Sequence, residues 1–223
     1  MLALRHLTGT VRFSLVFVAL TLGLALWSEP ELPDAWRFSR PAFETGAWWQ
    51  LITSQWVHLS GLHAVVNATG MVLMLVAFHG FVDTRTQLVA LLGGYLGVAT
   101  VLALDTHCNY YAGASGALHG FLAGNAIHMV LGKPGQVATP QTSLLVAHSS
   151  QAARVLALIV LLGLIVKLVV QHRPGTPAMP GWLGFSTYYP AHEAGAAGGL
   201  IAVVLVSAWR RGASAKGQSH KGQ

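Results

Sequence analysis

The chain has 223 residues, of which 53% are hydrophobic and only 9% are charged. Soluble domains carry about 25% charged residues, so this composition excludes an ordinary soluble domain and indicates an integral membrane protein. The length suffices for roughly six membrane spans of about 20 residues each, as one domain over 1–223. The formal charge of +6 comes from basic residues scattered at loop ends and tails, which favours membrane topology over nucleic-acid binding.

Apolar segments follow one another along the chain and predict an all-α bundle of six transmembrane helices. We place the spans at 11–27, 63–81, 87–104, 115–131, 152–170 and 191–209. The first run could instead be a signal peptide, but Ala25-Leu26-Trp27 is a poor small-x-small cleavage site, so a retained span is favoured. The segment 28–56 carries four tryptophans, a residue enriched at membrane surfaces, and predicts a partly helical interfacial loop.

The placement of lysine and arginine predicts the orientation of the bundle. With the N-terminus inside, nine basic residues fall on inside segments and four on or near the outside, as the positive-inside rule requires. The nine are Arg5, Arg12, Arg85, Lys133, Arg154, Arg210, Arg211, Lys216 and Lys221; the four are Arg37, Arg40, Lys167 and Arg173. Both termini are then cytoplasmic, 210–223 is a basic cytoplasmic tail, and spans two, four and six all begin from the outer side.

Small residues mark one face of the fourth span and one face of the sixth. The fourth carries Gly113, Gly116, Gly120 and Gly124, and the sixth carries Gly195 and Gly199 with His192 on the same face. Such spacing allows two helices to approach closely, although glycine stripes alone indicate only helix packing. If these faces meet, His192 lies near Ser115, and a serine bonded to a histidine is the minimum for hydroxyl activation.

The second span carries two polar residues, His63 and Asn67, four positions apart and therefore on one helix face. Polar side chains inside a membrane usually face the bundle interior and mark a functional site. Beside the backbone N–H of Ser115, these two donors would form an oxyanion hole. The alternative is that both only make hydrogen bonds between helices.

A metal site is the other chemistry that the sequence could support, because the chain has eleven histidines. Zinc sites on helices use defined spacings such as His-Glu-x-x-His. His192-Glu193 lacks the second histidine at that spacing, and His58 and His63 are five residues apart. We therefore expect neither a metal nor another cofactor.

Three ordered motifs resemble those of the rhomboid intramembrane serine proteases. Gly113-Ala114-Ser115-Gly116 is similar to the family's GxSG nucleophile motif, His192-x-x-Gly195-x-x-x-Gly199 to its catalytic-histidine helix, and His58-x4-His63-x3-Asn67 to its second-span motif. Each motif falls on the expected span of a six-span core. The resemblance covers about 12–209, nearly the whole chain.

The resemblance implies a Ser115–His192 catalytic dyad without a third acid. It also implies an oxyanion hole formed by His63, Asn67 and the Ser115 N–H, and a structural role for His58 between the first loop and the bundle. The glycines at 113, 116, 195 and 199, together with His119, would shape the site. The implied activity is hydrolysis of a peptide bond in or beside the membrane anchor of a substrate protein.

The chain departs from many rhomboids in two places. It has Trp49-Gln50 where many have Trp-Arg in the first loop, and His119 where many have a tyrosine that packs on the catalytic histidine. Gly-Ala-Ser-Gly-x-x-His resembles the rhombosortase branch, whose proposed substrates are secreted proteins with a C-terminal Gly-Gly motif, a span and a basic tail. The resemblance therefore implies membrane-anchored protein partners and, with the basic tail, a bacterial inner membrane.

Other functions remain open at this point. A general rhomboid that cuts diverse spans is one alternative, and a non-catalytic rhomboid-like protein that binds and escorts membrane proteins is another. Escort proteins of this kind usually lose the serine or the histidine, and this chain keeps both. A channel or transporter is less favoured, because the chain shows no internal repeat.

Overall fold

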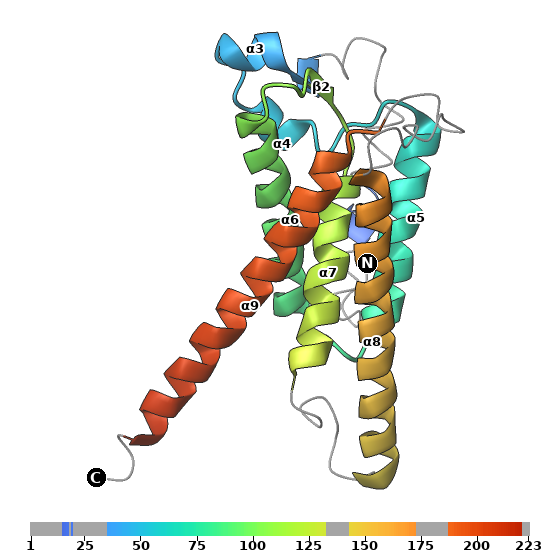
Figure 1. Cartoon of the computed structure of the whole chain (residues 1–223), viewed down its shortest axis with the longest axis vertical. Coiled ribbons are helices and arrows are strands. Elements are labelled where there is room, and N and C mark those ends of the chain that lie inside the picture. Colours follow the sequence, from blue (N-terminus) through green and yellow to red (C-terminus); the bar gives the residue numbers. More distant parts are fainter. Residues whose placement is uncertain (1–14, 18, 20–34, 133–142, 173–186, 220–223) are drawn as a thin grey trace, which may run out of the picture.

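The computed structural model (Figure 1) describes residues 15–17, 19, 35–132, 143–172 and 187–219. These residues form a helical bundle with one pair of two-residue strands. In chain order the elements are β1 (Phe38–Ser39), α3 (Arg40–Glu44), α4 (Gln50–Thr53), α5 (Gly61–Phe78), α6 (Thr84–Leu104), β2 (Tyr110–Tyr111), α7 (Ser115–Leu131), α8 (Ser143–His172) and α9 (Tyr189–Ser219).

Four of the described helices are long and apolar enough to cross a membrane. They are α5, α6, the part of α8 over Gln151–His172 and the part of α9 over Tyr189–Ala213. Helix α7, with 17 residues, lies between α5, α8 and α9 (Figure 1). The predicted first span, 11–27, lies mostly outside the described residues, so the count of six spans stays a prediction.

The observed helix bounds agree with the predicted ones for α7, which covers 115–131 as expected, and differ most for α8 and α9. Helix α8 begins at Ser143, nine residues before the predicted span 152–170. Helix α9 continues to Ser219, ten residues into the predicted tail. Neither extension contains proline, so no residue in them breaks the helix outright, although Gly212 and Gly217 weaken the second one.

Helices α6, α7 and α9 form the centre of the bundle and approach one another at glycines. A Cβ atom added to Gly195 would collide with the backbone carbonyl of Gly116, and one added to Gly199 would collide with that of Gly120. The same holds between α6 and α9, where a Cβ on Gly198 would collide with the Gly93 carbonyl. The predicted direct contact of the fourth and sixth spans is therefore confirmed.

The first loop braces the segment that leads into α7. Strand β1 pairs antiparallel with β2, with Phe38 opposite Tyr111. The buried side-chain oxygen of Gln50 accepts a hydrogen bond from the backbone N–H of Ser39 at 3.0 Å. Beyond β2, the Gly113 N–H donates to the Ser54 carbonyl at 2.8 Å. The strand pairing and the bond to Ser54 thus both join the first loop to the chain that leads into Ser115.

Arg40 fixes the end of α6 against this loop. Its buried guanidinium donates to the carbonyls of Leu102 at 2.5 Å and Asp105 at 2.6 Å, with longer contacts to two neighbouring carbonyls. The last carbonyls of a helix have no partner within the helix, so a cation at this position satisfies them. The arginine thereby anchors the connection from α6 to β2.

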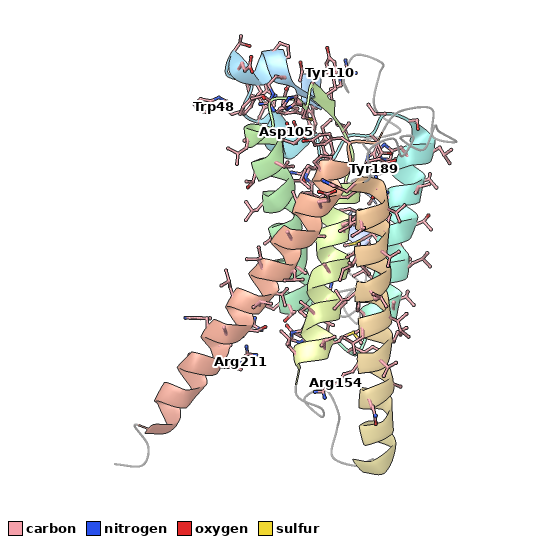
Figure 2. The ribbon with its side chains drawn as sticks, in the orientation of Figure 1. Trp48, Asp105, Tyr110, Arg154, Tyr189 and Arg211 are labelled. Carbon is pink, nitrogen blue, oxygen red and sulfur yellow. The ribbon has the colours of Figure 1, made fainter. Side chains whose placement is uncertain are left out.

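The two ends of the molecule differ in composition. Figure 2 shows Trp48, Asp105 and Tyr110 at one end, and Arg154 and Arg211 at the other. Trp48 is 72% exposed, on the surface of the first loop. Helix α9 crosses the bundle at an angle, and its C-terminal part extends away from the other helices (Figure 1).

Candidate active site

Ser115 is the first residue of α7, and the residues before it are held in a conformation that requires glycine. Gly113 has φ of +118°, in the left-handed region. A Cβ atom there would lie only 2.5 Å from Cε1 of His63. The hydroxyl of Tyr111 donates to the Gly113 carbonyl at 2.8 Å. As the first N–H of a helix, the backbone amide of Ser115 has no partner within α7.

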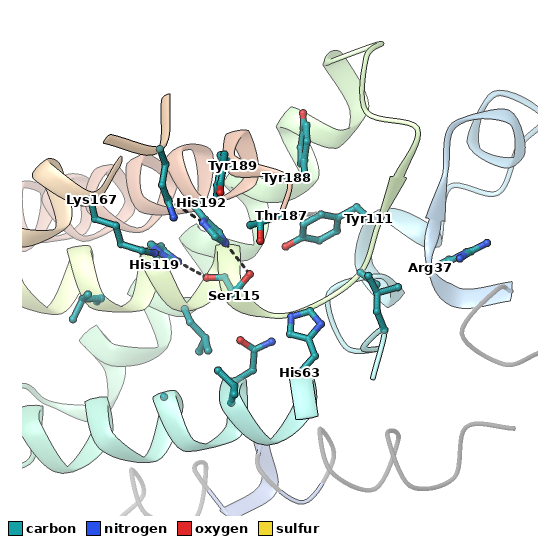
Figure 3. A pocket seen from close by; sticks show the side chains of 18 of the residues that line it. Arg37, His63, Tyr111, Ser115, His119, Lys167, Thr187, Tyr188, Tyr189 and His192 are labelled. Carbon is teal, nitrogen blue, oxygen red and sulfur yellow. Dashed lines mark hydrogen bonds between the residues drawn. The ribbon is translucent and has the colours of Figure 1, made fainter. Parts of the chain in front are cut away.

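The structure brings Ser115 and His192 together. Ser115 Oγ lies 3.0 Å from His192 Nε2, across the interface of α7 and α9 (Figure 3). The histidine is buried, and it precedes Gly195 by one turn of helix. Because Gly195 lies against the backbone of Gly116, the two helices are close enough for the side chains to meet. The glycine faces predicted that His192 would lie near Ser115, and the structure confirms this proximity.

His119 lies against both residues, one turn below Ser115. Its imidazole is stacked on that of His192, with ring centroids 4.2 Å apart and an interplanar angle of 12°. His119 Nδ1 donates to the Ser115 carbonyl at 2.6 Å, so its Nε2 is the acceptor for the ammonium group of Lys167. The imidazole of His119 therefore covers one face of the His192 ring.

His63 and Asn67 reach the same place from α5. Both are buried, and both line a cavity of about 850 Å³ together with Ser115 and His192. In the view of Figure 3, His63 and His192 lie on opposite sides of Ser115. Within the described part of the chain, Asn67 Nδ2 has no hydrogen-bond partner. A buried donor without a partner beside a cavity calls for an explanation, and an oxygen atom of a ligand in the cavity would supply one.

His58 lies behind His63, away from the serine. The two imidazoles meet edge to face, with centroids 4.9 Å apart. Burial, and then the neighbouring His63, lowers the pKa of His58 to about 3. The ring is therefore neutral at ordinary pH and packs as an uncharged group between the first loop and α5.

Residues at and just before the start of α9 line the cavity. They are Thr187, Tyr188 and Tyr189. The hydroxyl of Tyr188 donates to the carboxylate of Asp105, at the end of α6. This bond and those from His107 lower the pKa of Asp105. The start of α9 is thus tied to the segment that the first loop braces.

Sequence reasoning missed two residues of the site, Lys167 and Gln171 on α8. Lys167 bonds to His119, and Gln171 Oε1 lies 3.4 Å from Nδ1 of His192. Both line the cavity. They are the only polar side chains between residues 155 and 171, and polar residues inside an aliphatic span usually mark function. That signal could have identified Lys167 but not its partner, and Gln171 lies one residue beyond the predicted span 152–170.

Comparison with protein families supports the assignment that the motifs indicated. The family model described as the Rhomboid domain matches residues 45–209, which is most of the chain. The chain belongs to the rhomboid family. Rhomboid proteins are generally serine proteases that act on membrane proteins within the bilayer, and the four apolar helices agree with an integral membrane protein. Searches of curated proteins and of solved structures found no significant match.

Proposed function

We propose that this rhomboid protein is an intramembrane serine endopeptidase whose nucleophile is Ser115 and whose general base is His192. The observation that carries the proposal is the 3.0 Å contact between Ser115 Oγ and His192 Nε2 beside the cavity. A serine hydroxyl is a weak nucleophile until an adjacent base accepts its proton. Hydrolysis also needs water at membrane depth, and the polar side chains of the cavity provide a place for it.

The acylation step follows from this geometry. Ser115 Oγ attacks the carbonyl carbon of the scissile peptide bond while its proton passes to His192 Nε2. The tetrahedral intermediate collapses, the C–N bond breaks, and the imidazolium gives the proton to the leaving amine. The acyl group is then held as an ester on Ser115.

Water completes the reaction from the same cavity. It attacks the ester carbonyl while His192 takes one of its protons, and the proton returns to Ser115 Oγ as the C–O bond breaks. The products are one new carboxyl group and one new amine, with the enzyme unchanged. No third catalytic acid is required, in agreement with Glu193 being bonded to His172.

In each step the carbonyl oxygen of the tetrahedral intermediate becomes negatively charged, and it needs hydrogen-bond donors. We assign this role to His63, Asn67 and the Ser115 N–H, and the position of all three residues at the cavity together with the unpartnered Nδ2 of Asn67 supports the assignment. Gly116, Gly195 and Gly199 shape the site by letting backbones meet where a Cβ would collide, and Gly113 leaves room for the imidazole of His63. In this proposal His58 acts only structurally, behind His63.

For the substrate we favour membrane-anchored proteins with a C-terminal Gly-Gly motif, a span and a basic tail, as in rhombosortases. His119 supports this branch, because it takes the position of the usual tyrosine and stacks on His192. A general rhomboid activity on diverse spans is the alternative. A non-catalytic escort role is disfavoured by the intact Ser115–His192 contact.

The proposed organisation is a single six-span domain, with its core at about 12–209 and a basic tail after it, in a bacterial inner membrane. The site lies at the end that carries Trp48 and Tyr110, and the opposite end carries Arg154 and Arg211 (Figure 2). Basic residues favour the cytoplasmic side. This arrangement supports cytoplasmic termini and a site that opens outward.

Co-expression with a reporter tests the activity and the substrate class together. The reporter carries a Gly-Gly motif, a span and a basic tail, and a second reporter has the two glycines replaced by leucines. A rhombosortase cuts only the first, and a general rhomboid cuts both; neither is cut with Ser115→Ala. If the wild-type protein binds the first reporter and leaves it intact, the escort reading replaces the proposal.

A further inference from the structure

Two side chains of α8 reach the two stacked imidazoles of the site. Lys167 and Gln171 are four residues apart and therefore on one face of the helix. Lys167 donates to His119, and Gln171 Oε1 lies 3.4 Å from His192 Nδ1. The rest of α8 between residues 155 and 171 is apolar. Its two polar groups are thus both engaged with histidines of the site.

The contact with Gln171 bears on which nitrogen of His192 carries the proton. A neutral imidazole has one N–H and one lone pair, and the bond made by one nitrogen fixes the role of the other. An amide oxygen is only an acceptor, so opposite Gln171 Oε1 the Nδ1 atom must carry the hydrogen. Nε2 then presents its lone pair to the hydroxyl of Ser115, 3.0 Å away.

We propose that Gln171 is a positioning residue that holds His192 in the tautomer and orientation needed for a general base. This inference rests on the proposed function, and it assigns to an α8 amide the task that a buried carboxylate performs in a Ser-His-Asp triad. In the described part of the chain, Gln171 is the only hydrogen-bond partner of Nδ1. The separation of 3.4 Å is long, as is usual for catalytic hydrogen bonds before substrate binds.

The neighbouring contact between α8 and α9 gives a matched control. His172 Nδ1 lies 3.0 Å from the carboxylate of Glu193, one residue along from Gln171 and His192 in each helix. It joins the same two helix ends but does not touch the His192 ring. A variant that loses this contact loosens the helix ends while leaving Nδ1 of His192 paired.

The test measures how fast a fluorophosphonate probe labels Ser115 in the full-length protein, separating the maximal rate from the probe affinity. Gln171→Leu should lower the maximal rate by on the order of 10- to 100-fold with unchanged affinity, because Nδ1 loses its acceptor. Gln171→Glu should restore most of the rate, because a carboxylate is an acceptor. His172→Ala should label like the wild type.

A second measurement does not depend on activity. The ¹⁵N spectrum of histidine-labelled protein, with the His192 signals assigned by their loss in His192→Ala, should show a proton on Nδ1 in the wild type and a changed tautomer population in Gln171→Leu. A proton on Nε2 in the wild type, equal labelling rates for Gln171→Leu and wild type, or an equal loss with His172→Ala would each overturn the inference. If wild-type Ser115 reacts no faster than it does in His192→Ala, the proposed function fails instead, and the spectrum still decides the role of Gln171.

Discussion

The helices that carry the site are held in two different ways. Within their apolar stretches, 39% of α6 and 33% of α9 are buried, whereas only 11% of α8 is. Helices α6, α7 and α9 meet backbone to backbone at glycines, and α8 lies on α7 through a few side chains such as Ala157 and Leu164. Both kinds of helix contribute groups to the same site.

The glycine contacts and the side chains of α8 have different roles in the site. The glycine contacts leave little freedom in the distance between α7 and α9, so they set the separation of Ser115 and His192. Close-packed interiors respond to even a single added methyl group, so this separation is rigid. Helix α8 instead reaches the imidazoles with two long side chains, Lys167 and Gln171. We therefore expect changes in the glycine contacts to disrupt the fold, and changes in α8 to alter the rate.

The largest effect is expected for Gly195→Leu. The new side chain would collide with the backbone of Gly116, which cannot move aside as a side chain can. We expect a loss of at least about 3 kcal/mol in stability and no activity. Gly163→Leu in α8 is the control, because a Cβ at Gly163 meets nothing within 4 Å. Thermal denaturation in detergent compares the melting temperatures of the two variants. Equal melting temperatures would show that the glycine contacts are no more sensitive to added side chains than α8 is.

Asn67→Ala removes a donor that belongs to neither region. If Nδ2 stabilises the oxyanion, turnover should fall by roughly 10²- to 10³-fold. The melting temperature should stay close to that of the wild type, because Nδ2 has no partner to lose among the described residues. Reporter cleavage measures the rate, and Thr100→Ala, on the exposed face of α6, is a control that should leave it unaltered. Unchanged turnover in Asn67→Ala would leave the residue a packing role only.

The His58→Gln variant tests how the stability of the protein depends on pH. The pKa of an unfolded histidine is about 6.5, and burial lowers that of folded His58 to about 3. At pH values between these two pKa values, the unfolded state binds more protons than the folded state. The free energy of unfolding therefore decreases as the pH falls through this range. We expect His58 to contribute roughly 1–2 kcal/mol of the loss between pH 7.5 and pH 5.

The measurement is the melting temperature at the two pH values. The drop should be smaller in His58→Gln than in the wild type, and unchanged in His79→Gln, which alters an exposed histidine. An equal drop in all three proteins would show that His58 does not take part.

The smallest effect is expected where α7 meets α8, at His119. His119→Tyr keeps an aromatic surface against His192 and loses the acceptor for Lys167, whereas His119→Ala loses both. A stacked pair is worth about 0.5–1.5 kcal/mol, so His119→Ala should slow reporter cleavage by up to about 10-fold. His119→Tyr should lie between it and the wild type. If the tyrosine variant is as slow as the alanine variant, the bond to Lys167 matters more than the stack.

The sequence predicted those parts of the molecule that have a regular spacing. Helix α7 has its predicted bounds, and the glycines that repeat every three or four residues on it do face α9. The partners Ser115 and His192 followed from that interface. His63 and Asn67 were placed beside them because polar residues one turn apart in an apolar helix share a face.

The parts that lack such a spacing were missed. Strands of two residues, such as Tyr110–Tyr111, are too short to show alternation. The strand that pairs with them lies about 70 residues earlier in the chain, where Gln50 bonds to Ser39. Gln171 lies one residue beyond the predicted span 152–170, because the aliphatic run ends before it. No pattern connects it with His192, since α8 meets the site through side chains and not through a repeated backbone contact.

The most direct test of the central claim is mass spectrometry of the protein after treatment with a fluorophosphonate. We predict one adduct, on Ser115, that forms in the wild-type protein and is lost in His192→Ala, while Ser150→Ala labels normally. An adduct on Ser115 that forms equally fast without His192 would contradict the dyad, as would an unmodified Ser115 in folded wild-type protein that cleaves the reporter.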